Sequence, residues 1–147
     1  MPKTQYQNKM SDMIQTVEIL NPPTFYLMGK KQKKYYLTAQ ILYSGIHFSV
    51  RSKIVAFVKA FLVAECSRLK PLEPRSTVEL VFSTSRKISS KTLYDIDNRG
   101  YMWGKMLLDV FQKELKLIPN DNVWWVERVI YSFDPDRKDE SIVIKIY

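Results

Sequence analysis

Hydrophobic residues recur at spacings of three and four in two long stretches of the chain. The first stretch, residues 49–68, predicts a helix with Ser49 or Ser52 as its N-cap and Pro71 beyond its end. The second, residues 98–116, has large apolar residues on one side, namely Met102, Trp103, Met106, Leu107, Val110 and Phe111. We therefore expect two principal helices, each with one face in the core.

Other segments alternate between apolar and polar residues or are rich in Ile and Val, which predicts strands. They are residues 13–20, 77–83, 123–133 and 142–147. Residues 35–43 are interpreted as a short strand or one arm of a hairpin. A short charged turn at residues 134–140 favours an antiparallel hairpin of the last two strands, whereas strand-helix-strand units favour parallel neighbours. The predicted fold class is α/β (α+β), a mixed β-sheet with two principal helices packed against it.

The length of 147 residues suits one domain. We assign residues 13–147 to that domain and residues 1–12 to a flexible leader. With 46% hydrophobic and 26% charged residues, the composition is typical of a globular protein. No apolar run reaches the roughly 20 residues of a membrane helix, and the N-terminus lacks the apolar region of a signal peptide. We expect no membrane partner and a cytoplasmic location.

The chain has one cysteine and one histidine, Cys66 and His47. Neither an internal disulfide nor a zinc site of Cys and His ligands can be built from one residue of each type. Cys66 falls on the apolar side of the first predicted helix, and burial is its expected role. Hydrolytic chemistry in this chain would have to rest on carboxylates.

A net charge of +8 and a pI near 9.5 favour a polyanionic partner, with nucleic acid as the first expectation, although a basic surface can also serve solubility alone. Four of the lysines fall between Gly29 and Tyr35, in a segment typical of a solvated loop. Lysines followed by aromatic residues also suit an arm that binds phosphates and stacks on bases. The basic residues expected to contact DNA are Lys30, Lys31, Lys33, Lys34, Arg86, Lys87, Lys91 and Arg99.

Three carboxylates are candidates for metal binding. Asp95 and Asp97 stand one residue apart before Asn98 at the start of the second helix, and Asp121 follows that helix. If the first two lie on extended backbone, they point to the same face and Ile96 points into the core. Carboxylates are ligands for Mg²⁺, which at a phosphodiester activates water and neutralises charge. The structural alternative is that Asp97 is an N-cap and that the other two belong to polar loops and turns.

Two pairs of residues raise packing questions. Gly100 and Gly104 lie four apart on the second helix and permit close approach of another backbone. Trp124 and Trp125 alternate in and out of the sheet if their strand is regular, so one of them could face DNA or a dimer partner. Burial is the more common role for each, and Trp103 is expected in the core or in dimer packing.

The order of these motifs resembles the RusA family of Holliday junction resolvases. The residues that carry the resemblance are Asn21-Pro22-Pro23, Asp95-Ile96-Asp97-Asn98, Lys105-Met106-Leu107-Leu108-Asp109 and Ile118-Pro119-Asn120-Asp121. The similarity runs from about Val17 to the C-terminus. It implies a homodimeric endonuclease of DNA recombination and repair that cuts four-way junctions with Mg²⁺, or with Mn²⁺ as a substitute. It also implies that Asp95, Asp97 and Asp121 are metal ligands, and it makes a phage or prophage origin an expectation.

The family's catalytic lysine lies four residues after the second aspartate, where this chain has Tyr101. The matching Lys-led segment begins at Lys105, about 6 Å further along a helix. Lys105 is therefore the expected catalytic lysine, and Lys87, Lys91 and Arg99 are alternatives. Asn120 replaces an acid that precedes the third aspartate in many relatives.

A straight helix over residues 98–116 would separate Asp97 from Asp121 by about 30 Å. We expect residues 112–120 to return extended toward Asp97, and the alternative is that Asp121 acts across a subunit interface. Two active sites in a two-fold dimer would suit paired cuts in a branched substrate. The rival functions are a non-catalytic nucleic-acid-binding protein with the same fold and a nuclease acting on flaps or RNA.

Overall fold

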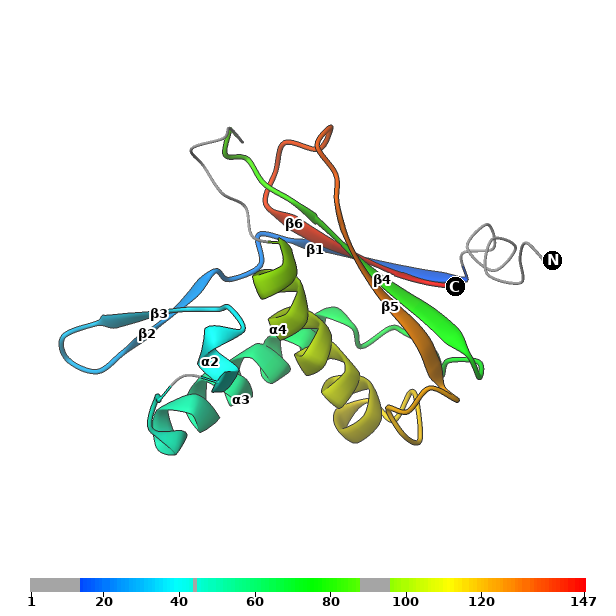
Figure 1. Cartoon of the computed structure of the whole chain (residues 1–147), viewed down its shortest axis with the longest axis horizontal. Coiled ribbons are helices and arrows are strands. Elements are labelled where there is room, and N and C mark those ends of the chain that lie inside the picture. Colours follow the sequence, from blue (N-terminus) through cyan, green and yellow to red (C-terminus); the bar gives the residue numbers. More distant parts are fainter. Residues whose placement is uncertain (1–13, 44, 88–95) are drawn as a thin grey trace.

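The computed structural model describes residues 14–43, 45–87 and 96–147, and for Asp97 the backbone alone. Its centre is a mixed four-stranded sheet in the order β1-β6-β4-β5 (Figure 1). The strands are β1 (Gln15–Leu20), β4 (Ser76–Ser83), β5 (Val126–Phe133) and β6 (Ser141–Ile146). All four predicted strands are thus confirmed, with small shifts of their ends.

The strand pairing confirms one topological prediction and corrects another. β4 and β5, which flank the second helix in sequence, are parallel neighbours. β6 runs antiparallel to β4 and to β1, so the last two strands run in opposite directions as predicted. Direct pairing of β5 with β6 has to be corrected, because β4 lies between them and each of the two pairs with β4. The charged turn therefore crosses the end of β4.

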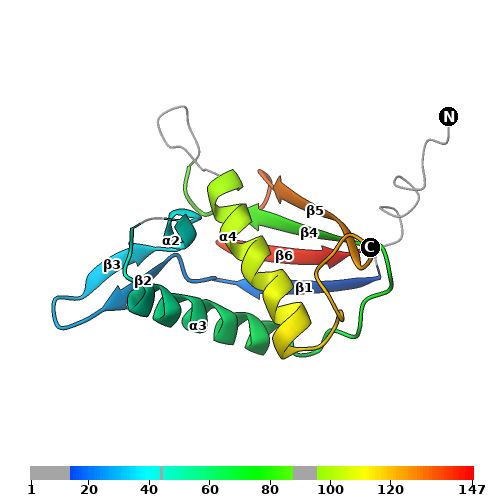
Figure 2. The ribbon, with the colours of Figure 1, turned by 60° about the horizontal axis from the view of Figure 1, so that its bottom comes forward.

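Two long helices cover the same face of the sheet (Figure 2). They are α3 (Phe48–Glu65) and α4 (Ile96–Asp109), and α4 continues directly into the π-helix η1 (Val110–Glu114). The predicted serine caps of α3 are wrong. His47 is the N-cap, and its ring Nδ1 accepts a hydrogen bond of 3.2 Å from the Ser49 backbone N–H. The sequence pattern located both helices because each buries one apolar stripe.

The core lies between this helix pair and the sheet. Its largest fully buried side chains include Trp103, Phe82, Phe111 and Leu80. Trp103 packs edge-on against Phe61 of α3, so the prediction of core packing for Trp103 is confirmed. No helix in the described ranges is long and apolar enough to cross a membrane.

The glycines of α4 make room for a tyrosine ring. A Cβ on Gly100 would lie 2.7 Å from Cγ of Tyr131, and one on Gly104 would lie 2.6 Å from the Tyr131 hydroxyl. Close approach at this pair was predicted, but the neighbour is a side chain from β5 rather than another backbone. The ring therefore fixes α4 against the parallel edge of the sheet.

A two-stranded hairpin extends beyond the sheet on the side of α3 (Figure 1). It consists of β2 (Phe25–Met28) and β3 (Lys33–Tyr36), joined by a turn in which Gly29 has φ +78° and Gln32 has φ +51°. The hairpin alternative was right for residues 35–36, whereas residues 40–43 form the short helix α2 (Gln40–Tyr43). Lys30 and Lys31 thus lie in an exposed turn, as a solvated loop would have them, whereas Lys33 and Lys34 belong to the second strand of the hairpin.

Candidate functional site

The acidic motif leads into the first turn of α4. Asp95 lies outside the described residues, and Asp97 is the second residue of the helix. Ile96 is half-buried and packs against the core, as predicted. The premise that residues 95–97 are extended is wrong from Ile96 onward, because Ile96 and Asp97 already have helical backbone. For the same reason Asp97 lies inside the helix and is not its N-cap.

Asn98 joins the start of α4 to the segment that follows the hairpin. Its side-chain oxygen accepts a hydrogen bond of 2.9 Å from the Ala39 backbone N–H, and its own carbonyl oxygen lies 3.1 Å from the same nitrogen. Asn is suited to this position because one short side chain supplies an acceptor close to its own backbone. The asparagine that ends the Asp-x-Asp-Asn motif therefore connects the segment after the basic hairpin to the first turn of α4.

Tyr101 and Lys105 lie on one exposed stripe of α4. Both are exposed, and residues four apart on a helix share a face. The Tyr101 hydroxyl is hydrogen-bonded to that of Tyr43 from α2, and the two ring centroids are 5.8 Å apart. This hydrogen bond to Tyr101 raises the pKa of Tyr43 above its ordinary value. The position four residues after Asp97 is thus occupied by Tyr101, which is paired with Tyr43. Lys105 lies about 6 Å further along the helix axis.

Asp121 lies beyond the opposite end of α4 from the acidic motif. It belongs to the irregular segment between η1 and β5, and it is exposed. The predicted extended return of residues 112–120 is wrong, because residues 112–114 continue the helix. Leu117 and Ile118 are then held there by hydrogen bonds from their backbone N–H groups to the Phe111 carbonyl.

The strand β5 makes the return toward the acidic motif, and it begins only after Asp121. The 14 residues of α4 alone span about 20 Å. Within one chain, therefore, Asp121 and the start of α4 are at opposite ends of a helix. Among the described residues no three carboxylate, histidine or cysteine side chains gather as a metal site.

Asp109, in the Lys-led segment of the resemblance, has a structural contact. Its carboxylate lies 3.6 Å from the ammonium of Lys59, so it bridges α4 and α3. Both side chains are about one-fifth exposed, which makes this a partly screened ion pair. Asp109 is therefore a matched carboxylate for testing the role of Asp97 on the same helix.

A basic cavity of about 440 Å³ lies beyond the carboxyl end of β4. Its lining residues are Thr84, Ser85, Arg86, Lys87, Phe133, Pro135, Arg137 and Lys138. Glu140 holds one wall: it accepts hydrogen bonds from the Thr84 hydroxyl and from the Ser85 backbone N–H at 3.2 Å. The carboxyl ends of parallel strands are a common place for ligands, and Figure 2 shows β4 ending near the start of α4.

The remaining basic candidates have different environments. Arg86 and Lys87 are exposed, and Lys91 lies outside the described residues. Arg99 is half-buried and already interacts with other groups. On the hairpin, Lys30 and Lys31 are exposed at the turn, and the lysines of β3 lie over aromatic rings.

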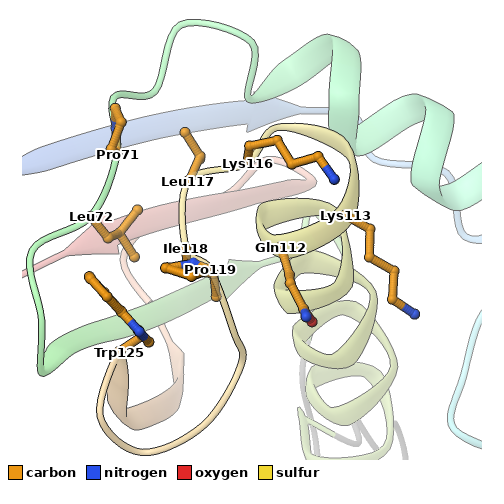
Figure 3. Close-up of a pocket in the computed structure, with 9 residues that line it drawn as sticks. All are labelled: Pro71, Leu72, Gln112, Lys113, Lys116, Leu117, Ile118, Pro119 and Trp125. Atoms are coloured by element: carbon orange, nitrogen blue, oxygen red, sulfur yellow. The ribbon is translucent and has the colours of Figure 1, made fainter.

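A second cavity, of about 530 Å³, lies at the far end of α4 (Figure 3). Leu72, Ile118 and Trp125 line it, and Lys113 and Lys116 from the helix end stand at its side. None of the described residues that line this cavity is a carboxylate, so it offers no anionic oxygen ligand for a hard cation. It does not coincide with any site predicted from the sequence.

Four single residues complete the comparison with the sequence predictions. Cys66 is fully buried, as predicted, and burial raises the pKa of its thiol to about 12. Trp125 packs against the core, whereas Trp124 is 60% exposed, so the expected burial is wrong for Trp124. Both precede β5, where strand alternation does not apply. Tyr43 was not predicted as a site residue, since its contact with Tyr101 depends on tertiary structure.

Comparisons with models of protein families, with curated proteins and with solved structures gave no match. The geometry of the start of α4 is therefore interpreted from its own residues.

Proposed function

We propose that this protein is a Mg²⁺-dependent, structure-selective DNA endonuclease resembling the RusA family, which resolves four-way junctions. The observation that carries the proposal is the link between Asn98 and Ala39, because it brings the segment after the lysine-rich hairpin to the first turn of α4, which contains Asp97. A polyanion held by the hairpin would meet the acidic motif directly. Mn²⁺ is the expected substitute metal.

In this proposal Asp95 and Asp97 bind the metal, which when bound activates water at the phosphodiester. The chain's own contribution is to hold and orient the DNA. Arg86 and Lys87 would contact phosphates beside the acidic loop, and phosphate contacts position a substrate without specifying its sequence. Lys105 would supply positive charge from the exposed stripe of α4, with Lys91 as the alternative.

The third carboxylate fits this set only if it comes from a second copy. Because α4 separates Asp97 from Asp121 within one chain, we assign the metal site to Asp95 and Asp97 of one protomer with Asp121 of the partner subunit. This arrangement requires a homodimer, and a two-fold dimer would contain two such sites. Paired cuts across a branched substrate follow from that symmetry.

The test is cleavage of a labelled four-way junction, a flap, a linear duplex and a structured RNA, with and without Mg²⁺. We expect metal-dependent paired nicks in the junction. Asp97→Asn should reduce cleavage by roughly a thousandfold, since it removes a charged metal ligand, while junction binding stays equal or tightens because a negative charge beside DNA is lost. Asp109→Asn, on the same helix, is the matched control and should keep cleavage. Unimpaired cleavage by Asp97→Asn would refute the site.

Subunit complementation tests the shared site. Asp97→Asn and Asp121→Asn are each expected to be inactive alone. In a mixed dimer one site loses both carboxylates and the other regains both, so mixing the two variants should restore nicking of one strand at a time. If mixing restores nothing while each variant still dimerises, Asp121 does not act across the interface.

One rival function has specific support. Tyr101 occupies the lysine position of the family, and Asp121 is remote from Asp97 in the same chain, so the same surface would also suit a nucleic-acid-binding protein without catalysis. Tight junction binding with no cutting under Mg²⁺ or Mn²⁺ would establish that function instead.

A further inference from the structure

The outward face of the β2–β3 hairpin presents aromatic rings beside a lysine. Phe25 and Tyr36 are direct cross-strand partners, and Leu27 is paired with Lys34. Side chains alternate along a strand, so these two pairs share one face. Phe25 is 37% and Tyr36 61% exposed. Adjacent exposed rings form an apolar patch, and such patches often mark interaction surfaces.

The inward face of the same hairpin is anchored. Tyr26 lies against Phe57 of α3, with 5.1 Å between the ring centroids, and Tyr35 packs against the core. The Leu37 backbone N–H also donates a hydrogen bond of 3.0 Å to the Thr24 carbonyl, which closes the base of the hairpin. The outward rings are therefore held on a fixed support, and little conformational entropy is lost when they bind.

The charge around these rings identifies the chemistry of the partner. Residues 19–64 contain seven of the 23 basic residues and none of the 15 acidic ones, so this stretch alone supplies seven of the eight net positive charges. Lys34 Nζ lies 4.3 Å from the Phe25 ring centroid and 5.8 Å from that of Tyr36. Positive charge directly beside exposed rings matches a ligand that combines flat aromatic groups with phosphates.

A second copy of the chain fits this face poorly. A two-fold contact would place the same lysine-rich surface against itself, with no carboxylate of the hairpin, α2 or α3 up to Ala64 to neutralise it. Unpaired nucleic-acid bases fit well, because every base has a face that stacks on an aromatic ring and carries a phosphate beside it. In a paired duplex those base faces are already stacked on one another.

We propose that the outward hairpin face binds unpaired DNA bases, with Phe25 and Tyr36 stacking on successive bases and Lys34 holding the phosphate between them. The choice of DNA over RNA rests on the proposed function, whereas the stacking itself does not. The strand bound there would continue past Ala39 to the start of α4. Such a surface would favour substrates with unpaired bases at or beside a branch point.

The experiment measures binding of a fluorescent 15-nucleotide oligothymidine by anisotropy, in EDTA so that cleavage plays no part. Phe25→Ala and Tyr36→Ala should each weaken binding roughly tenfold, whereas Tyr36→Phe, which keeps the ring, should bind like the wild type. An abasic strand of the same length offers phosphates without bases. Its binding should be weaker than that of the oligothymidine and the same for all of these variants.

Leu27→Ala is the matched control, since it truncates an exposed apolar side chain on the same face without removing a ring. It should change binding less than twofold, and thermal melts should show that every variant remains folded. The proposal is overturned if a variant carrying both Phe25→Ala and Tyr36→Ala keeps wild-type affinity for oligothymidine, or if Leu27→Ala weakens binding as much as the ring variants do. It is also overturned if the ring variants lose as much affinity for the abasic strand as for oligothymidine. Ring-dependent binding of oligouridine but not of oligothymidine would also overturn it.

Sedimentation velocity tests whether the hairpin face instead binds a second copy of the chain. A ring variant that dissociates a dimer would show that the face joins two copies of the chain, which overturns the inference. The result is also independent of the nuclease proposal: ring-dependent binding by a protein that cuts no substrate supports the hairpin surface and refutes the endonuclease.

Discussion

The stretch from residue 19 to 64 and the remainder of the chain manage charge in opposite ways. The first, which holds the hairpin, α2 and nearly all of α3, has seven basic residues and no acidic ones; the remainder has sixteen basic and fifteen acidic residues. In the remainder some of these charges form ion pairs: Arg137 contacts Glu18 and Asp139, and Arg75 contacts Glu127. One further ion pair, between Lys59 and Asp109, joins the two regions. On the hairpin, Lys33 and Lys34 lie against aromatic rings instead.

Polar side chains of the sheet likewise form hydrogen bonds with one another. Glu79 accepts hydrogen bonds from the Ser132 hydroxyl at 2.6 Å and from the Tyr147 hydroxyl at 3.1 Å. Burial and the neighbouring Glu79 charge raise the pKa of Tyr147. The comparison teaches that charged groups beside the sheet contribute to its internal contacts, whereas the hairpin keeps an excess of positive charge, on which the proposal of a polyanionic partner rests.

The largest expected effect comes from removing the excess charge. A hairpin set, in which Lys30, Lys31 and Lys33 become Gln, should weaken binding to a four-way junction by on the order of a hundredfold in about 0.1 M salt, because each lost phosphate contact removes nearly one unit of salt dependence. The measurement is a salt titration of junction affinity. A control set removes the same charge near the cavity at the far end of α4, at Lys113, Lys116 and Lys70, the last of which precedes the lining residue Pro71.

The control set should weaken binding only a few-fold through the general loss of net charge. If the two sets lower affinity and salt dependence equally, the hairpin has no special role in binding. The difference in charge between the two regions would then have no consequence for DNA binding.

The next effect concerns the packing of α4 on the sheet. Gly100→Ala should destabilise the wild type by about 1 kcal/mol or more, because a Cβ would lie 2.7 Å from Cγ of Tyr131, an atom close to the backbone that cannot move aside. With Tyr131→Ala as background, the same change should stabilise by up to about 1 kcal/mol through helix propensity. Urea denaturation of the four proteins measures this reversal, and the same sign in both backgrounds would contradict the contact.

The smallest effect concerns the hydrogen bond between Ala39 and Asn98, which joins the two regions. Asn98→Ala removes the side-chain acceptor of the Ala39 N–H, and the Asn98 carbonyl still lies 3.1 Å from that nitrogen, so the expected loss of stability is about 1 kcal/mol. Hydrogen exchange at the Ala39 amide should become faster. Asn98→Asp keeps an oxygen at this position and should retain most of the protection of the Ala39 amide. Unchanged exchange in Asn98→Ala would argue against the hydrogen bond between Ala39 and the Asn98 side chain.

Much of the fold was readable from the sequence because it depends on neighbouring residues. The spacings of three and four located α3 and α4, and alternation located β1, β4, β5 and β6, since one face of each element is apolar. The hairpin strand Phe25–Met28 was missed because four residues give too short a pattern. The candidate site was only partly readable: residue types indicated which side chains could bind metal or phosphate, and spacing indicated where in the chain they lie.

The sequence by itself determined the buried stripes, the burial of Cys66 and Trp103, and the small residues at Gly100 and Gly104. Only the tertiary structure decided that β4 separates the last two strands, that the Tyr131 ring packs against Gly100 and Gly104, and that Trp124 is exposed. It also decided that Asn98 holds the hairpin segment and that Asp121 lies at the other end of α4. The physical reason is that periodicity is a local property of the chain, whereas strand order and contacts between distant residues follow from how the whole core is packed.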